Sequence, residues 1–238
     1  MLSADLGPAE AFTGLPRRAS RSSEEGGNAL LDRLDGESFA ALYPDLTPVT
    51  LTRGQRLTQS EMTWFPLSAR IAVSWTLTDG PVIDTFLVGS EGAFSAPAST
   101  DASARVTVRR AGEAYRVCSR RLAELRRILP DLAVTMDAEA ARQLYEAQRT
   151  AACIAAHTLE ARMATWLLRC CGERPGTMLP ITQEELAEVL GAQRTSVNVG
   201  AQALKIQGAI AYLRGRIRIT DPERLEARSC ACYRTQRA

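Results

Sequence analysis

The residues best suited to chemistry lie in the last quarter of the chain, where basic side chains occur without acidic ones. Five of the 29 basic residues and none of the 27 acidic residues fall between Ala192 and Arg218. The five are Arg194, Lys205, Arg214, Arg216 and Arg218. A surface of one sign attracts phosphate groups, because each neutralised phosphate releases condensed counterions. This segment therefore predicts a surface that binds nucleic acid.

Two short helices are predicted to position these side chains. Thr182-Gln183-Glu184-Glu185 fits a capping box, in which the Thr182 hydroxyl accepts from the Glu185 N–H and the Glu185 carboxylate reaches back. Gly191 ends this helix, and a second helix runs from about Arg194 to Gly208. Its inward face is predicted to hold Val197, Ala201 and Leu204. Two short helices joined by a tight glycine-containing turn form a helix-turn-helix.

A wing is predicted to follow the second helix. Ala209-Ile210-Ala211-Tyr212 and Ile217-Arg218-Ile219 have the apolar, β-branched character of strands, and they flank Arg214-Gly215-Arg216. This arrangement predicts a two-stranded hairpin whose tip carries arginines.

The outward face of the second helix is predicted to read base edges. Its candidate base-contacting residues are Arg194, Thr195, Asn198 and Val199. Arginine can pair bidentately with guanine, and the methyl groups of Thr195 and Val199 can contact thymine. A further group is predicted to contact the DNA backbone. It comprises Thr182, Gln183, Gln193, Ser196, Gln202, Arg214 and Arg216.

Residues 131–157 predict one long helix, about 40 Å at a rise of 1.5 Å per residue. Apolar residues recur along it at steps of three and four: Leu132, Met136, Ala140, Leu144, Ala147, Ala151 and Ile154. We expect this stripe to pack against a second copy of the chain, with Glu139 and Glu146 among the charges that lie off it. Packing of the helix on its own β-domain is the alternative.

The remaining sequence predicts an all-β domain. Between Thr47 and Val117, short β-branched and aromatic runs alternate with turns; Ile71–Leu77 and Val82–Val88 flank the turn dipeptide Asp79-Gly80. Two short helices are predicted between Asn28 and Leu42. With 238 residues, 45% of them hydrophobic, the chain can bury a core. We expect a flexible arm (1–27), a β-roll domain with flanking helices (28–130), a dimerisation helix (131–157) and a winged helix-turn-helix domain (158–238).

The C-terminal motifs resemble those of a known family. Leu179–Val197, Gly208–Tyr212 and Arg214–Asp221 are similar to the winged helix-turn-helix of the Crp/Fnr family of bacterial transcription regulators. The order of the elements is also similar over about residues 28–233. The resemblance implies an α+β fold with an N-terminal antiparallel β-roll (a cupin-like jelly roll), a long dimerisation helix and a C-terminal winged helix-turn-helix. It also implies a homodimer on an inverted-repeat operator.

The chain departs from the family pattern in both halves. Thr195 and Val199 stand where the family usually has an acid and a second arginine, so its common half-site is not implied. The positions of the family's cyclic-nucleotide-binding pairs fall at Ser95-Ala96, Ala104-Arg105 and Ala147-Gln148. A cyclic-AMP ligand is therefore not expected, and no cofactor is predicted. A different small-molecule effector, or none, stays open.

The positions of the cysteine and histidine residues do not predict a metal site. Residues 1–117 contain no cysteine, which excludes an N-terminal cysteine cluster for iron and sulfur. The single histidine, His157, is interpreted as a hinge or cap residue. Cys170-Cys171 and Cys230-Ala231-Cys232 are expected to be small buried residues, because Cys-x-Cys is tighter than the usual Cys-x2-Cys zinc loop. Thiol redox sensing and a metal role are weaker alternatives.

Enzymatic and membrane functions find little support. The sequence has no glycine-rich phosphate loop, no HExxH and no CxxC motif. Its longest runs without a charged residue are ten residues, Thr150–Leu159 and Thr195–Leu204, against the roughly 20 needed to span a bilayer. No secretory signal is legible, so we expect a cytoplasmic protein.

The expected partners are double-stranded DNA and a second copy of the chain. RNA polymerase is a further candidate, through the loop from Gly172 to Met178. The alternative function is a ligand-binding or protein-docking module whose winged helix binds a protein. The acid-free segment argues against it, and binding insensitive to salt would favour it.

Overall fold

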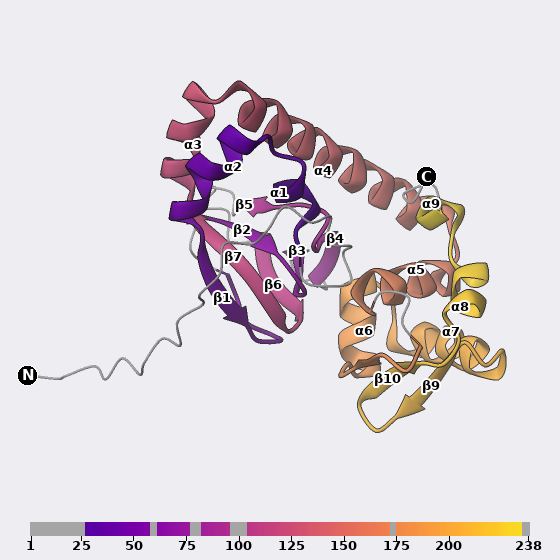
Figure 1. Ribbon diagram of the computed structural model, residues 1–238. Helices are drawn as coiled ribbons and strands as arrows, with labels where there is room; N and C mark the ends of the chain where they lie inside the picture. Colours follow the sequence, from indigo (N-terminus) through magenta and orange to yellow (C-terminus); the bar gives the residue numbers. More distant parts are fainter. Residues whose placement is uncertain (1–26, 58–60, 77–81, 96–103, 172–174, 235–238) are drawn as a thin grey trace, which may run out of the picture.

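The computed structural model describes residues 27–57, 61–76, 82–95, 104–171 and 175–234 (Figure 1). Several predicted features lie outside these residues: the arm up to residue 26, the Asp79-Gly80 turn, Ala96, and the beginning of the loop from Gly172. Along the described chain, no helix combines the length and the apolar character that crossing a membrane requires.

The described residues of the N-terminal half form two antiparallel sheets. One has the strand order β1-β7-β2-β5 and comprises β1 (Thr47–Leu51), β7 (Gly112–Cys118), β2 (Met62–Pro66) and β5 (Phe94–Ser95). The other has the order β4-β3-β6 and comprises β4 (Val82–Val88), β3 (Arg70–Thr76) and β6 (Ala104–Arg110). Strand β4 buries every second residue, Asp84, Phe86 and Val88, as expected for a strand with one face on a core. The predicted β-domain is confirmed.

Short helices cover one end of the β-domain. They are α1 (Ala29–Asp32), α2 (Gly36–Leu42), the 3-10 turn η1 (Tyr43–Asp45) and α3 (Ser119–Ile128). Asn28 and Asp35 cap α1 and α2 by accepting from backbone N–H groups. Apolar side chains of these helices meet Phe65 in a second core cluster, which confirms the two helices predicted before residue 42.

A single long helix, α4 (Pro130–Ala156), leads from α3 past the β-domain to the C-terminal half (Figure 1). Proline in its first turn costs no hydrogen bond, because the first N–H groups of a helix have no partner in the helix. His157 ends α4 with extended backbone, at φ −106° and ψ 150°.

The C-terminal half is helical around a small sheet. It comprises α5 (Leu159–Cys171), β8 (Met178–Leu179), α6 (Gln183–Leu190), α7 (Arg194–Ile206), β9 (Ile210–Leu213), β10 (Arg216–Ile219), α8 (Pro222–Arg228) and α9 (Ala231–Arg234). The sheet has the order β8-β10-β9, so the predicted two-stranded wing gains a third strand. One apolar cluster from Met163 to Tyr233 forms its core.

The two halves meet where β4 packs against α6. The contact is tight at Gly191, where a Cβ would lie 2.8 Å from the side chain of Ile83. Gly191 also has φ +58°, in the left-handed region that glycine tolerates best. The close approach of Ile83 and the left-handed backbone therefore each favour a glycine at this turn of the helix-turn-helix.

Candidate DNA-binding surface

The capping box forms as predicted and fixes the start of α6. The Thr182 hydroxyl accepts from the Glu185 N–H at 3.1 Å, and Glu185 Oε2 accepts from the Thr182 N–H at 2.8 Å. Glu185 Oε1 also pairs with Arg53 of the β-domain at 3.0 Å. Burial acts to raise the pKa of Glu185, but the Thr182 N–H and the Arg53 guanidinium outweigh it and lower the pKa.

Helix α7 has one buried face and one exposed face. Val197, Ala201 and Leu204 are buried, which confirms the predicted inward face. Gln193 precedes the helix and makes no side-chain capping bond. All four predicted base-contacting residues are exposed: Arg194, Thr195, Asn198 and Val199. The side chain of Val199 is the least expected of these, because an apolar residue is here 72% exposed.

Helix α6 holds two of these side chains by polar contacts that the sequence pattern did not predict. Arg194 Nη1 donates to Glu184 Oε2 at 3.2 Å, and both side chains are 67% exposed. Gln183 Nε2 donates to Asn198 Oδ1 at 3.1 Å. An acid and an amide in the first turn of α6 can therefore set the orientation of two polar side chains of α7.

The wing and the starts of both helices surround one hollow of about 470 Å³. Its walls are formed by Thr182, Gln183, Glu184, Arg194, Tyr212, Leu213, Arg214 and Gly215. Gly215 forms the hairpin turn with φ +65°. Four predicted DNA contacts, on α6, α7 and the wing, are thus brought to one place.

The other predicted backbone contacts do not line this hollow. They are Gln193, Ser196, Gln202 and Arg216, and all four are exposed. Arg218 and Lys205 are exposed as well. Among the described residues, the acid-free segment from Ala192 to Arg218 therefore presents its cations to solvent. Glu184 is the acid that lies among them at the hollow.

The apolar stripe of α4 predicted to form the dimer interface is buried at one end and exposed at the other. Leu132 is fully buried in its own chain, in the cluster with Phe65, and Met136 packs against the same cluster. Leu132 therefore has no exposed area for a second chain, which departs from the prediction. The more distant part of the stripe is available: Ala140, Leu144, Ala151 and Ile154 are exposed, and Ala147 is half-buried.

Two acids expected off the stripe are buried instead, Glu139 against the β-domain and Glu146 against α5. Glu139 is 3% exposed and accepts from Arg142 at 2.7 Å through both oxygens, and from Gln143 at 2.8 Å. Burial lowers the pKa of Arg142, but the bonds and the charge of Glu139 raise it by more. Glu146 is 7% exposed and pairs with Arg169 at 2.9 Å. Ion pairs within the chain, rather than apolar side chains, therefore hold this part of α4 in place.

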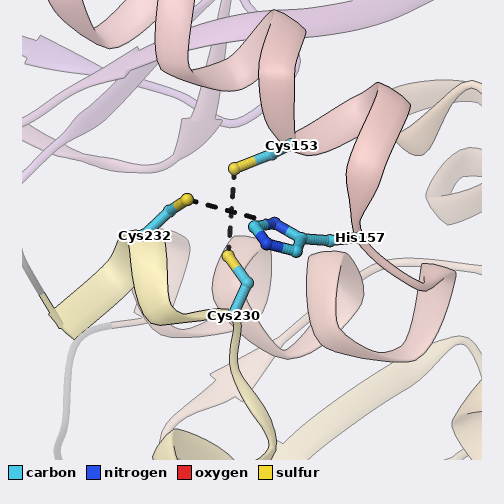
Figure 2. A group of neighbouring side chains, drawn as sticks. All are labelled: Cys153, His157, Cys230 and Cys232. Carbon is cyan, nitrogen blue, oxygen red and sulfur yellow. Dashed lines mark hydrogen bonds between the residues drawn. The ribbon is translucent and has the colours of Figure 1, made fainter.

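Four residues that the sequence pattern left apart lie together near the end of α4. They are Cys153, His157, Cys230 and Cys232 (Figure 2). His157 ends α4, as predicted for a cap residue, and also faces the three cysteines. Cys230 is buried as predicted, whereas Cys232 is only half-buried. Cys170 and Cys171 do fit that prediction, because both are buried and burial raises the pKa of the Cys171 thiol to about 12.

Comparison with known proteins identifies the C-terminal domain. Residues 161–228 match the Crp-like helix-turn-helix domain. No curated protein matches the sequence.

Several solved structures have a fold similar to that of most of this chain. A Crp/Fnr-family regulator from Eubacterium rectale has a TM-score of 0.63 and 16% identity, over 84% of this chain and 96% of that chain. FixK2 from Bradyrhizobium japonicum has a TM-score of 0.62 and 16% identity, over 78% and 98%. A Crp/Fnr-family regulator from Thermus thermophilus has a TM-score of 0.60 and 19% identity, over 77% and 98%. The predicted fold class is confirmed.

Proposed function

Because residues 161–228 form a Crp-like helix-turn-helix domain and the chain has the fold of Crp/Fnr transcription regulators, we propose that it binds specific DNA sequences as a homodimer. One observation carries the proposal: α6, α7 and the wing bring exposed polar and basic side chains around a single hollow. The match is to a regulator domain and not to an enzyme.

Helix α7 would read the sequence in the major groove. Its exposed face offers Arg194 for guanine, Thr195 and Val199 for thymine methyl groups, and Asn198 for adenine. Arg194 and Asn198 would first exchange their partners on α6 for base edges. These bonds are exposed and cost little to break, since ion pairs in solvent contribute about 0–1 kcal/mol.

The DNA backbone would lie along the hollow and its rim. Thr182, Gln183 and Arg214 line the hollow, and the exposed Gln193, Ser196, Gln202 and Arg216 would add further contacts. Contacts of this kind fix the register of the domain on the duplex, and they carry the salt dependence of binding.

The second copy would pack along the exposed part of α4. This part begins near Ala140 and continues through Leu144, Ala147, Ala151 and Ile154. Leu144, 62% exposed in the single chain, is a large apolar side chain that such packing would cover. A two-fold axis along α4 would place one α7 in each half-site of an inverted repeat.

We also propose that cyclic AMP is not the effector. The inner side of α4 beside β5 is occupied by the chain's own groups: Glu139 accepts from the Ala93 N–H at 3.3 Å, and Gln143 donates to the Ala93 carbonyl at 2.5 Å. The expected cytoplasmic location and a contact with RNA polymerase remain parts of the proposal.

Selection of bound DNA from a random pool tests the function directly. The purified chain is expected to enrich an inverted repeat whose half-sites are about one helical turn apart, roughly 10 base pairs. Adding cyclic AMP is expected to leave the enrichment unchanged. A pool without an enriched motif, or binding that does not weaken with salt, would contradict the proposal and favour a protein partner for the winged helix.

A further inference from the structure

The cluster of Cys153, His157, Cys230 and Cys232 brings together two segments that are distant in the sequence. Cys153 lies in the last turn of α4, and His157 follows it by four residues. Cys230 precedes α9, and Cys232 lies within that helix. Figure 2 shows the four side chains converging on a common point from these two sides. Their ligand atoms all lie within 4.8 Å of one another.

The separations are those of ligands around one ion. The Sγ atoms of Cys153 and Cys230 are 4.0 Å apart, and Cys232 Sγ is 3.9 Å from His157 Nδ1. A tetrahedral zinc ion with bonds of about 2.3 Å to sulfur and 2.0 Å to nitrogen has edges of about 3.8 Å between sulfurs and 3.5 Å between sulfur and nitrogen. A disulfide would need sulfurs at about 2.05 Å, about half the distance between the Sγ atoms of Cys153 and Cys230.

We propose that these four residues bind one zinc ion. Three thiolates and one imidazole form a donor set that structural zinc sites use, and they fill all four positions. The geometry favours a single ion over a cluster of several iron atoms, because all four donors face one point.

The surroundings support a thiolate site. The Thr165 hydroxyl donates to the Ala161 carbonyl at 2.9 Å and accepts from the Cys230 N–H at 3.2 Å, so it fixes the Cys230 ligand against α5, as groups around zinc ligands commonly do. Arg149, Arg162 and Arg169 line a small adjoining cavity of about 60 Å³ together with three of the ligands. Arg149 and Arg169 pair with Glu146, whereas the charge of Arg162 acts on Cys153 and lowers the cost of collecting three thiolates.

The sequence pattern does not predict this site, because each of the two segments supplies only two of the four ligands. Cys-x-Cys alone is tighter than a zinc loop, and a cysteine and a histidine four residues apart at the end of a helix supply only two ligands. The fold joins the halves across 77 residues, the separation of Cys153 and Cys230. Bound zinc would fasten the C-terminal segment to the junction of α4 and α5, which connects the long helix to the helix-turn-helix.

Metal analysis of the full chain tests the proposal. The chain is expressed with zinc and iron salts, purified with reductant, and analysed by elemental mass spectrometry. We expect one zinc ion per chain, and loss of most of it in Cys153→Ser and in Cys232→Ser. Cys118→Ser is the matched control, because this exposed cysteine at the end of β7 lies outside the cluster, and its zinc content should equal that of the wild type.

A second pair of variants separates ligand loss from misfolding. His157→Cys retains four donors and should keep zinc, whereas His157→Ala should lose it. Cobalt(II) replacing zinc should give the absorption of a tetrahedral, thiolate-bound ion in the wild type and in His157→Cys. The proposal is overturned by a wild-type chain that binds neither ion when reduced, by iron with sulfide in place of zinc, or by a disulfide within the cluster. It does not depend on DNA binding.

Discussion

The indole Nε1 of Trp166, on α5, donates a hydrogen bond to Oδ2 of Asp84, on β4, at 3.2 Å. Asp84 is 7% exposed and also accepts from Ser74 at 2.6 Å and from Arg109 through both of its oxygens, at 2.9 and 2.5 Å. One carboxylate thus satisfies donors from both sides of the boundary between the β-domain and the helical domain. A buried charge is tolerated here because it is paired and fully hydrogen-bonded.

Asp84→Asn is expected to destabilise the chain by about 3 kcal/mol, because removing one partner of a buried ion pair leaves the other uncompensated. Arg109 retains some solvent contact, so the lower end of the usual range applies. Urea denaturation measures the change. Trp166→Phe is the matched control: it keeps a ring in place and removes a single hydrogen bond, at a cost of about 1 kcal/mol. Equal midpoints for Asp84→Asn and the wild type would show that the pair contributes nothing to stability.

Contacts close in sequence could be predicted well. The capping box at Thr182, the stop at Gly191 and the return strand Val82–Val88 each depend on neighbouring residues, and all three form as expected. Local rules apply there because the groups that satisfy one another lie within four residues.

Features that depend on distant contacts could not be predicted. Strand β8 is two residues long and has no periodicity, so only its partner β10 defines it. Glu139 and Glu146 look like solvent-exposed acids until the fold supplies Ala93 and Arg169 as their partners. Cys153 and Cys230 similarly become neighbours only when α5 and α8 have packed together.

Arg194→Ala is expected to weaken binding to the selected operator by about 1–3 kcal/mol, because a bidentate arginine–guanine pair is worth about that much. Binding to unrelated DNA should change much less. Fluorescence anisotropy with both DNA types measures the ratio. Glu184→Gln is the control, since it removes the partner of Arg194 on α6 and leaves the arginine, and it should bind at least as well as the wild type. Unchanged discrimination in Arg194→Ala would exclude this residue as a base contact.

Arg214→Ala at the tip of the wing is expected to weaken specific and nonspecific binding alike. If Arg214 neutralises one phosphate, the slope of log K against log salt should become about 0.9 less negative. A titration over several salt concentrations measures this slope. Arg127→Ala is the control, because Arg127 is exposed on α3, far from the wing (Figure 1). A slope that is the same in Arg214→Ala and Arg127→Ala would exclude Arg214 as a phosphate contact.

Leu144→Glu is expected to convert a dimer into monomers. The side chain is 62% exposed on the part of α4 left free by the β-domain, and a carboxylate there would bring two like charges together at a two-fold axis. Sedimentation velocity measures the mass. Ile128→Glu is the control, because Ile128 is also exposed but lies on α3, outside the predicted stripe, and should leave the dimer intact. Operator binding should fall together with the dimer, because two linked half-sites bind far more tightly than one. A wild-type chain that sediments as a monomer, or a Leu144→Glu chain that stays dimeric, would place the interface elsewhere or abolish it.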